Sequence, residues 1–291
     1  MVDAEILKQV RTIQIRARRQ VAELLAGGYA SVFRGQGMEF DEIRPYVPGD
    51  DVRTIDWNVT ARFGLPYIKR FREERELTVM LLVDLSASGD FGSGTRAKRR
   101  ALAELGAILA LSAVGGGDKV GLVLFTDGIE LYIPPKRGRT HVLRLIRELL
   151  AFEPAGRGTS IRGALEFLGR VRKRRAVAFL LSDFRDEGWE HALTVAARRH
   201  DVICLRAHDP REETLPTVGL VELRDLETDE RRLVDTSDPG VRERFAVNAR
   251  ERAAVVESAC TRARADTVDV PVDRPLAEPV ARFFQRRERR R

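Results

Sequence analysis

Oxygen-bearing side chains stand in three predicted loops of the chain. Asp84 ends the first apolar run, and Ser86 and Ser88 come after it at alternate positions. Thr159 precedes an amphipathic segment, and Asp183 comes just after a later apolar run. Mg²⁺ and Mn²⁺ prefer oxygen ligands, and Mg²⁺ usually keeps several waters in its octahedral shell. Two carboxylates and three hydroxyls leave such a shell partly open, which predicts a divalent-metal site that can accept an outside carboxylate.

The framework that must position these side chains is predicted by apolar runs that alternate with amphipathic segments. Continuous apolar runs are typical of strands buried on both faces of a parallel sheet. We expect such strands at 78–83, 120–125, 176–181 and 202–205, with helices at 95–114, 139–151, 161–172 and 189–199. This alternation predicts an α/β fold with a doubly wound, mostly parallel, Rossmann-type sheet. Ligands collect beyond the carboxyl ends of its strands, where all five residues are expected.

We expect three parts along the chain. The first, 1–75, combines an amphipathic helix with a turn-rich segment of short strands, in which Trp57 anchors the segment in the core. The second, 76–275, is the α/β domain, and the third, 276–291, is a basic tail. Further elements are expected as a helix at 4–26, an antiparallel edge strand at 129–133, two edge strands at 218–223 and 231–234, a helix at 239–264 and a last strand at 267–270.

Charge and composition limit the classes of function that are compatible with this chain. The net charge is +7, but 51 basic and 44 acidic residues are interleaved, apart from the arginine-rich end 286–291. This end can touch a polyanion, but no aromatic residues interleave with basic ones as in proteins that stack bases, so no specific nucleic-acid partner is expected. The chain has two cysteines, no secretory signal and no apolar stretch long enough for a transmembrane segment. We therefore expect a cytoplasmic protein.

Two other interpretations of the same residues stay open. Asp and Ser after a strand are common helix caps, so Asp84, Ser86 and Ser88 alone do not define a metal site. A Mg²⁺-dependent phosphohydrolase is the alternative function, because Asp84 ends a first strand as a nucleophile would. Such an enzyme usually has a second Asp two residues later and a nearby Lys, and Ser86 stands at that place. Zinc, P-loop and serine-hydrolase motifs are missing, so we expect no enzyme.

The order Asp-x-Ser-x-Ser, then Thr159, then Asp183 resembles the metal-ion-dependent adhesion site of von Willebrand factor A domains. All five elements occur in the order of that family, each in an expected loop. The resemblance implies that Asp84, Ser86, Ser88, Thr159 and Asp183 hold Mg²⁺ or Mn²⁺. It also implies a protein-interaction module whose partner supplies an Asp or Glu to the metal.

A second resemblance concerns the preceding segment. The run GDDVRTIDW at 49–57, followed by Ala61 and Arg62, is similar to the signature of the bacterial family called domain of unknown function 58. The resemblance covers roughly residues 28–250 and implies a von Willebrand factor A-like domain. It further implies an adaptor or cofactor of a MoxR-type AAA+ ATPase, active in the assembly or maturation of protein complexes.

Overall fold

A computed structural model describes residues 37–74, 77–94 and 96–290. The helix expected at 4–26 lies outside the described residues. The chain divides into two compact units, of which one is Phe33–Leu77 and the other contains Thr78–Arg291. None of the helices among the described residues is long and apolar enough to cross a membrane.

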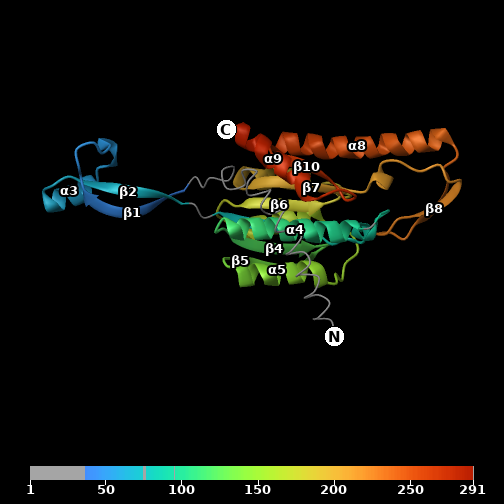
Figure 1. The fold of residues 1–291 in the computed structure, drawn as a ribbon, viewed down its shortest axis with the longest axis horizontal. Coiled ribbons are helices and arrows are strands. Elements are labelled where there is room, and N and C mark those ends of the chain that lie inside the picture. The colour runs from blue at the N-terminus through green and yellow to red at the C-terminus, as the bar shows by residue number, and fades with distance from the viewer. Residues whose placement is uncertain (1–36, 75–76, 95, 291) are drawn as a thin grey trace. The chain divides into compact units, whose positions relative to one another are not determined.

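The larger unit is built on a six-stranded sheet with the order β10-β7-β6-β3-β4-β5 (Figure 1). All neighbours pair in parallel except β4 and β5, which are antiparallel. The doubly wound, mostly parallel sheet and its antiparallel edge strand are therefore confirmed. The strands are β3 (Thr78–Asp84), β4 (Lys119–Phe125), β5 (Ile129–Lys136), β6 (Val177–Ser182), β7 (Asp201–His208) and β10 (Asp266–Pro271).

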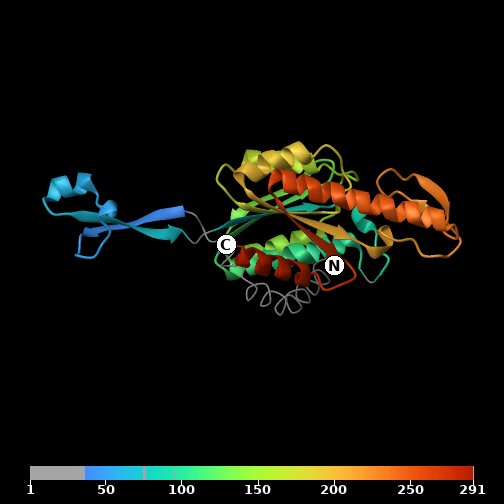
Figure 2. The same cartoon turned by 90° about the horizontal axis from the view of Figure 1, so that it is seen from above.

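Helices cover both faces of this sheet, which is why its central strands are apolar without interruption. One layer consists of α4 (Lys98–Gly115), α5 (Arg139–Ala151) and α9 (Ala277–Arg289). The other consists of α6 (Ile161–Val171), α7 (Glu190–Arg199) and α8 (Pro239–Ala263), and the two layers lie on opposite sides of the sheet (Figure 2). Met80 and Leu82 of β3 pack in the core beneath the second layer. Every residue of β3 is buried, so the strand that carries Asp84 is held from both sides.

Two expectations about the C-terminal part are wrong. The strands β8 (Leu220–Arg224) and β9 (Arg231–Asp235) do not extend the main sheet but pair only with each other as an antiparallel hairpin. Their residues are exposed or half-buried, which suits a solvated hairpin better than a sheet covered on both faces. The segment expected to be a basic tail forms helix α9, in which Val280, Phe283 and Phe284 are buried. The apolar residues recur at helical spacing, but the arginines between them made this pattern difficult to recognise in the sequence.

The smaller unit is a two-stranded hairpin with an irregular excursion. Strands β1 (Gly37–Pro45) and β2 (Tyr67–Glu74) pair antiparallel, with the short helix α3 (Trp57–Phe63) between them. Asp56 caps α3 by accepting from two backbone N–H groups, and it pairs with Lys69 at 2.9 Å. Trp57 is 70% exposed, so the expectation that it anchors a core is wrong. A unit this small has little interior, and among its described side chains Ile68 is the buried apolar one.

Candidate metal centre

The structure brings all five predicted residues to the carboxyl edge of the sheet. Asp84 is the last residue of β3, and Asp183 follows the end of the neighbouring strand β6. Ser86 and Ser88 lie in the turn after β3, and Thr159 lies in the loop that leads into α6. The ends of adjacent parallel strands share one edge, which is why residues far apart in the sequence meet here.

Backbone hydrogen bonds hold the two hydroxyl-bearing loops together. The N–H of Ala87 donates to the carbonyl oxygen of Arg157 at 2.9 Å, which ties the loop of Thr159 to the turn after β3. The N–H of Ser160 donates to the carbonyl oxygen of Thr126 at 2.7 Å, which ties the same loop to the end of β4. Thr159 is therefore fixed beside the end of β3 by the backbone on both sides.

The turn after β3 differs from the extended loop that the alternating Asp, Ser and Ser suggested. Residues Ala87–Asp90 form a short 3₁₀ helix, and its curvature places the Ser86 and Ser88 hydroxyl oxygens 3.0 Å apart. The Ser86 N–H donates to Oδ1 of Asp84 at 2.9 Å, so this carboxylate does order the turn. Ser86 itself makes no side-chain capping hydrogen bond. One oxygen of Asp84 therefore orders the turn, whereas the Ser86 hydroxyl does not cap the 3₁₀ helix.

Asp84 is a buried carboxylate close to a second one. Its side chain is 3% exposed, and its Oδ2 accepts a hydrogen bond of 2.6 Å from the Ser182 hydroxyl. Burial and the negative charge of Asp183 raise the pKa of Asp84 to about 7, against the opposite effect of hydrogen bonds from Ser182 and Ser86. Such a carboxylate is stabilised by any additional positive charge placed between it and Asp183.

A buried lysine, which the sequence analysis did not identify, contacts the second carboxylate. Lys98, the first residue of α4, has no solvent exposure. Its Nζ lies 2.5 Å from Oδ2 of Asp183 and 2.7 Å from Oε1 of Glu212. Burial alone would raise the pKa of Asp183, but the Lys98 ammonium, together with Arg185 and the Ser88 hydroxyl, outweighs it and holds that pKa below its usual range. Lys98 stands in the basic run RAKRR, where no local pattern separates it from surface residues.

A fourth carboxylate reaches the hydroxyl groups from the β8–β9 hairpin. Glu227 lies in the turn between the two strands, and its Oε1 accepts a hydrogen bond of 3.1 Å from the Thr159 hydroxyl. Ser88 lines the same cavity as Glu227. Burial raises the pKa of Glu227, aided by the negative charges of Asp183 and Asp225, while the hydroxyl groups of Thr159 and Ser88 act in the opposite direction. Sequence reasoning missed Glu227 because it placed the hairpin at the edge of the main sheet.

The charges of this cluster fit a divalent cation. Arg185 is the second basic group, with its Nη2 3.1 Å from Glu212. When all four carboxylates are ionised, they exceed the two basic side chains by two negative charges, which one divalent ion would neutralise. Among the described residues no group of three or more His, Cys, Asp or Glu side chains is arranged to hold a metal, so the site depends on its hydroxyls. The charged members are Asp84, Asp183, Glu212, Glu227, Lys98 and Arg185.

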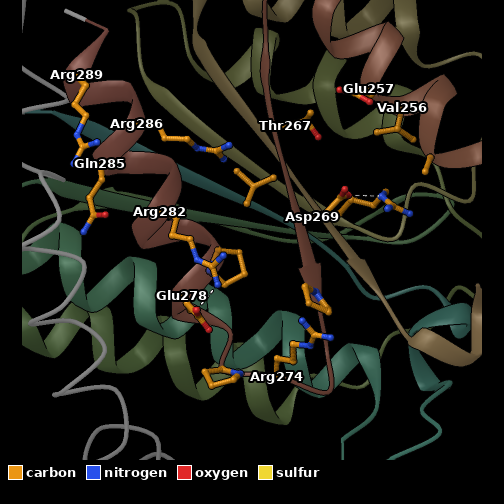
Figure 3. Close-up of a pocket in the computed structure, with 16 residues that line it drawn as sticks. Val256, Glu257, Thr267, Asp269, Arg274, Glu278, Arg282, Gln285, Arg286 and Arg289 are labelled. Atoms are coloured by element: carbon orange, nitrogen blue, oxygen red, sulfur yellow. Dashed lines mark hydrogen bonds and ion pairs between the residues drawn. The ribbon is translucent and has the colours of Figure 1, made fainter. Parts of the chain in front are cut away.

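Two cavities are relevant to binding. A cavity of about 520 Å³ borders the site, between Ser88 and Phe91 on one side and the hairpin residues Leu226 and Glu227 on the other. A groove of about 710 Å³ runs along β10 between α8 and α9 (Figure 3). Its lining shares no residue with the predicted site. Five arginines and three acidic residues line this groove: Arg206, Arg274, Arg282, Arg286, Arg289, Glu257, Asp269 and Glu278.

Comparisons with solved structures concern the fold. BatB from Bacteroides thetaiotaomicron aligns with a TM-score of 0.47 at 16% identity, over 73% of this chain and 99% of that one. Proximal thread matrix protein 1 from the mussel byssus, solved with a zinc-occupied metal-ion-dependent adhesion site, aligns with a TM-score of 0.37 at 16% identity, over 45% of this chain and 38% of that one.

Comparisons of sequence define the family. Uncharacterised proteins of Mycobacterium tuberculosis (strain H37Rv) and Mycobacterium bovis are 32% identical over 290 residues, which cover 99% of this chain and 91% of theirs. The model of the family described as "Protein of unknown function DUF58" matches residues 42–255. This match spans the signature at 49–57 and five of the six strands of the central sheet, including β3 and β6, whose ends carry Asp84 and Asp183. The chain belongs to the DUF58 family.

Proposed function

We propose that this protein is a metal-dependent protein-interaction module without enzymatic activity. The observation that carries the proposal is the cluster of Asp84, Ser86, Ser88, Thr159 and Asp183 at one edge of the sheet, with an excess of negative charge. These five side chains would hold Mg²⁺ or Mn²⁺ by oxygen atoms. The bound ion supplies an electrophilic position to which a carboxylate can bind. An Asp or Glu of a partner protein is the group that fits it.

We further propose that the partner is a MoxR-type AAA+ ATPase in the cytoplasm, which this protein serves as an adaptor in the assembly or maturation of protein complexes. This partner is supported by the resemblance of the segment at 49–57 to the domain of unknown function 58 family, because that resemblance implies a MoxR-type partner. The buried, unpaired thiols of Cys204 and Cys260 are compatible with a reducing compartment.

The geometry of the site supports a phosphohydrolase less well than a metal-dependent binding module. Lys98 is the lysine that such chemistry would need beside a phosphate, but its ammonium is fully buried against Asp183 and Glu212. Ser86 occupies the place of the second carboxylate, and the Asp84 carboxylate already accepts two hydrogen bonds. We therefore expect no turnover of phosphomonoesters or nucleotides by protein saturated with Mg²⁺.

The proposal is tested by capturing the candidate ATPase on immobilised protein. We expect binding in Mg²⁺ that is lost in EDTA and in Asp84→Asn, a variant of equal size that removes one carboxylate charge. Asp90→Asn is the matched control, because Asp90 lies in the same turn but is exposed and pairs with Arg99. Capture that persists in EDTA, or that Asp84→Asn leaves unchanged, would contradict metal-dependent binding.

A further inference from the structure

Hydrogen bonds order the turn that carries Glu227 and connect it to the predicted site. The carboxylate of Asp225 accepts hydrogen bonds from the N–H groups of Glu227, at 2.8 Å, and Thr228, at 3.0 Å. The guanidinium of Arg157 donates to the carbonyl oxygen of Leu226 at 2.8 Å. The carbonyl oxygen of this same Arg157 accepts from the turn after β3, so one residue links the hairpin to both hydroxyl-bearing loops.

The Glu227 carboxylate contacts one of the five predicted ligands and lines the same cavity as a second. It accepts a hydrogen bond of 3.1 Å from the Thr159 hydroxyl, and it shares the cavity beside the site with Ser88. Its side chain is half-buried although it belongs to an exposed turn. A carboxylate that only needed solvation would point outward here, as the Glu222 and Glu230 carboxylates of the same hairpin do, which pair with Arg231 and Arg232.

We propose that Glu227 is an internal ligand of the site. The three carboxylates of Asp84, Asp183 and Glu227 are not arranged around one point in this structure, so with a metal bound Glu227 would turn from the Thr159 hydroxyl to the ion and take the place that a partner carboxylate must take. This inference rests on the proposed function, because it assigns an occupant to the open position of the same metal. Binding of a partner is then an exchange of one carboxylate for another. The site is closed by the chain itself until the partner displaces Glu227.

The hairpin is built so that this exchange costs little. Its strands pair only with each other, and Leu220 and Leu233 are 67% and 71% exposed. Few buried apolar contacts oppose its displacement, and segments of this kind open locally at low free energy. The cavity beside the site is lined by hairpin residues, including Leu223 and Val234, so withdrawal of the hairpin would widen it toward the site.

Mn²⁺ alone is the probe for this inference, because its affinity is measured by calorimetry and its bound waters by proton relaxation. We expect Glu227→Ala to weaken Mn²⁺ binding by at least about tenfold, because loss of a residue that only supports a metal ligand already costs about that much. The relaxation enhancement of bound Mn²⁺ should rise, because a water replaces the lost carboxylate oxygen. Acetate should then lower this enhancement at smaller concentrations than in the parent protein. Glu227→Gln, which keeps the size of the side chain, should shift all three quantities in the same direction.

Glu222→Ala is the matched control, since it removes the same charge from the same hairpin at an exposed position. It should leave the Mn²⁺ affinity and the relaxation unchanged. If the parent protein binds Mn²⁺ and Asp84→Asn does not, while Glu227→Ala behaves as the parent does, the internal ligand is refuted and the metal site stands. If the parent protein does not bind Mn²⁺, both the site and the internal ligand are refuted.

Discussion

Removal of the buried lysine, Lys98, should lower the unfolding free energy, because it leaves two largely buried carboxylates without their ammonium partner. Lys98→Met keeps the length of the side chain and deletes the ammonium that lies 2.5 Å from Asp183 and 2.7 Å from Glu212. The Asp183 and Glu212 side chains are 5% and 13% exposed, so solvent cannot replace the lost charge. Breaking a buried ion pair by removing one partner costs roughly 3–5 kcal/mol of unfolding free energy. Glu212 keeps Arg185 at 3.1 Å, which places the expected loss near the lower limit, about 3 kcal/mol.

A divalent ion held by Asp183 should compensate part of this loss. Urea unfolding in EDTA and in Mg²⁺ measures both values, and we expect a smaller difference between parent and variant in Mg²⁺. Lys173→Met is the control, since this exposed lysine should change the unfolding free energy by no more than about 0.5 kcal/mol. A loss below about 0.5 kcal/mol for Lys98→Met in EDTA would refute the buried pair. An equal loss in both media would show that Mg²⁺ and Lys98 do not share the charge of Asp183.

Three further predictions concern stability. Burial, followed by the charges of Arg172 and other arginines, lowers the pKa of His200, and neither ring nitrogen has a hydrogen-bond partner. The unfolded chain therefore binds a proton near pH 6.5 that the folded state resists, so His200 should reduce stability as the pH falls from about 6.5 toward its lower folded pKa. His200→Leu should remove this loss, which is measured as the unfolding free energy of parent and variant between pH 7 and pH 5. A difference between the two proteins that stays constant over this range would disprove it. Phe284 is fully buried and its ring contacts Phe179, so Phe284→Ala should cost about 3–5 kcal/mol of unfolding free energy. A loss below about 1 kcal/mol in thermal or urea unfolding would instead support a detached tail. Trp57→Ala should change stability by no more than about 0.5 kcal/mol because the side chain is 70% exposed, and a loss above about 2 kcal/mol would restore its expected role as a core anchor.

The central fold follows from local pattern because a parallel sheet covered on both faces needs continuous apolar strands. Val79–Val83 and 177–181 are such runs, and their positions placed Asp84 and Asp183 at one edge before any contact was known. The β8–β9 strands have no such run, and their alternating exposure did not reveal whether they joined the main sheet. Helix α9 was missed because arginines surround its apolar stripe.

The charged surroundings of the site depend on tertiary structure, and no local pattern predicts them. Lys98 meets Asp183 because α4 begins beside the end of β6, and Glu212 joins them from the short helix after β7. Glu227 reaches Thr159 because Arg157 fixes the hairpin turn over the loop. The positions of Asp84 and Asp183 at the strand ends were therefore predictable, whereas the charged residues around them were not.

Calorimetric titration of Mg²⁺ and Mn²⁺ into metal-free protein, with Asp84→Asn beside it, tests the central claim most directly. Asp84→Asn keeps the size of the side chain and removes one of the two carboxylates among the five predicted ligands. We expect one ion to bind to the parent protein and no measurable binding to the variant. Equal binding to both would place any metal elsewhere, and binding to neither would contradict the metal centre itself.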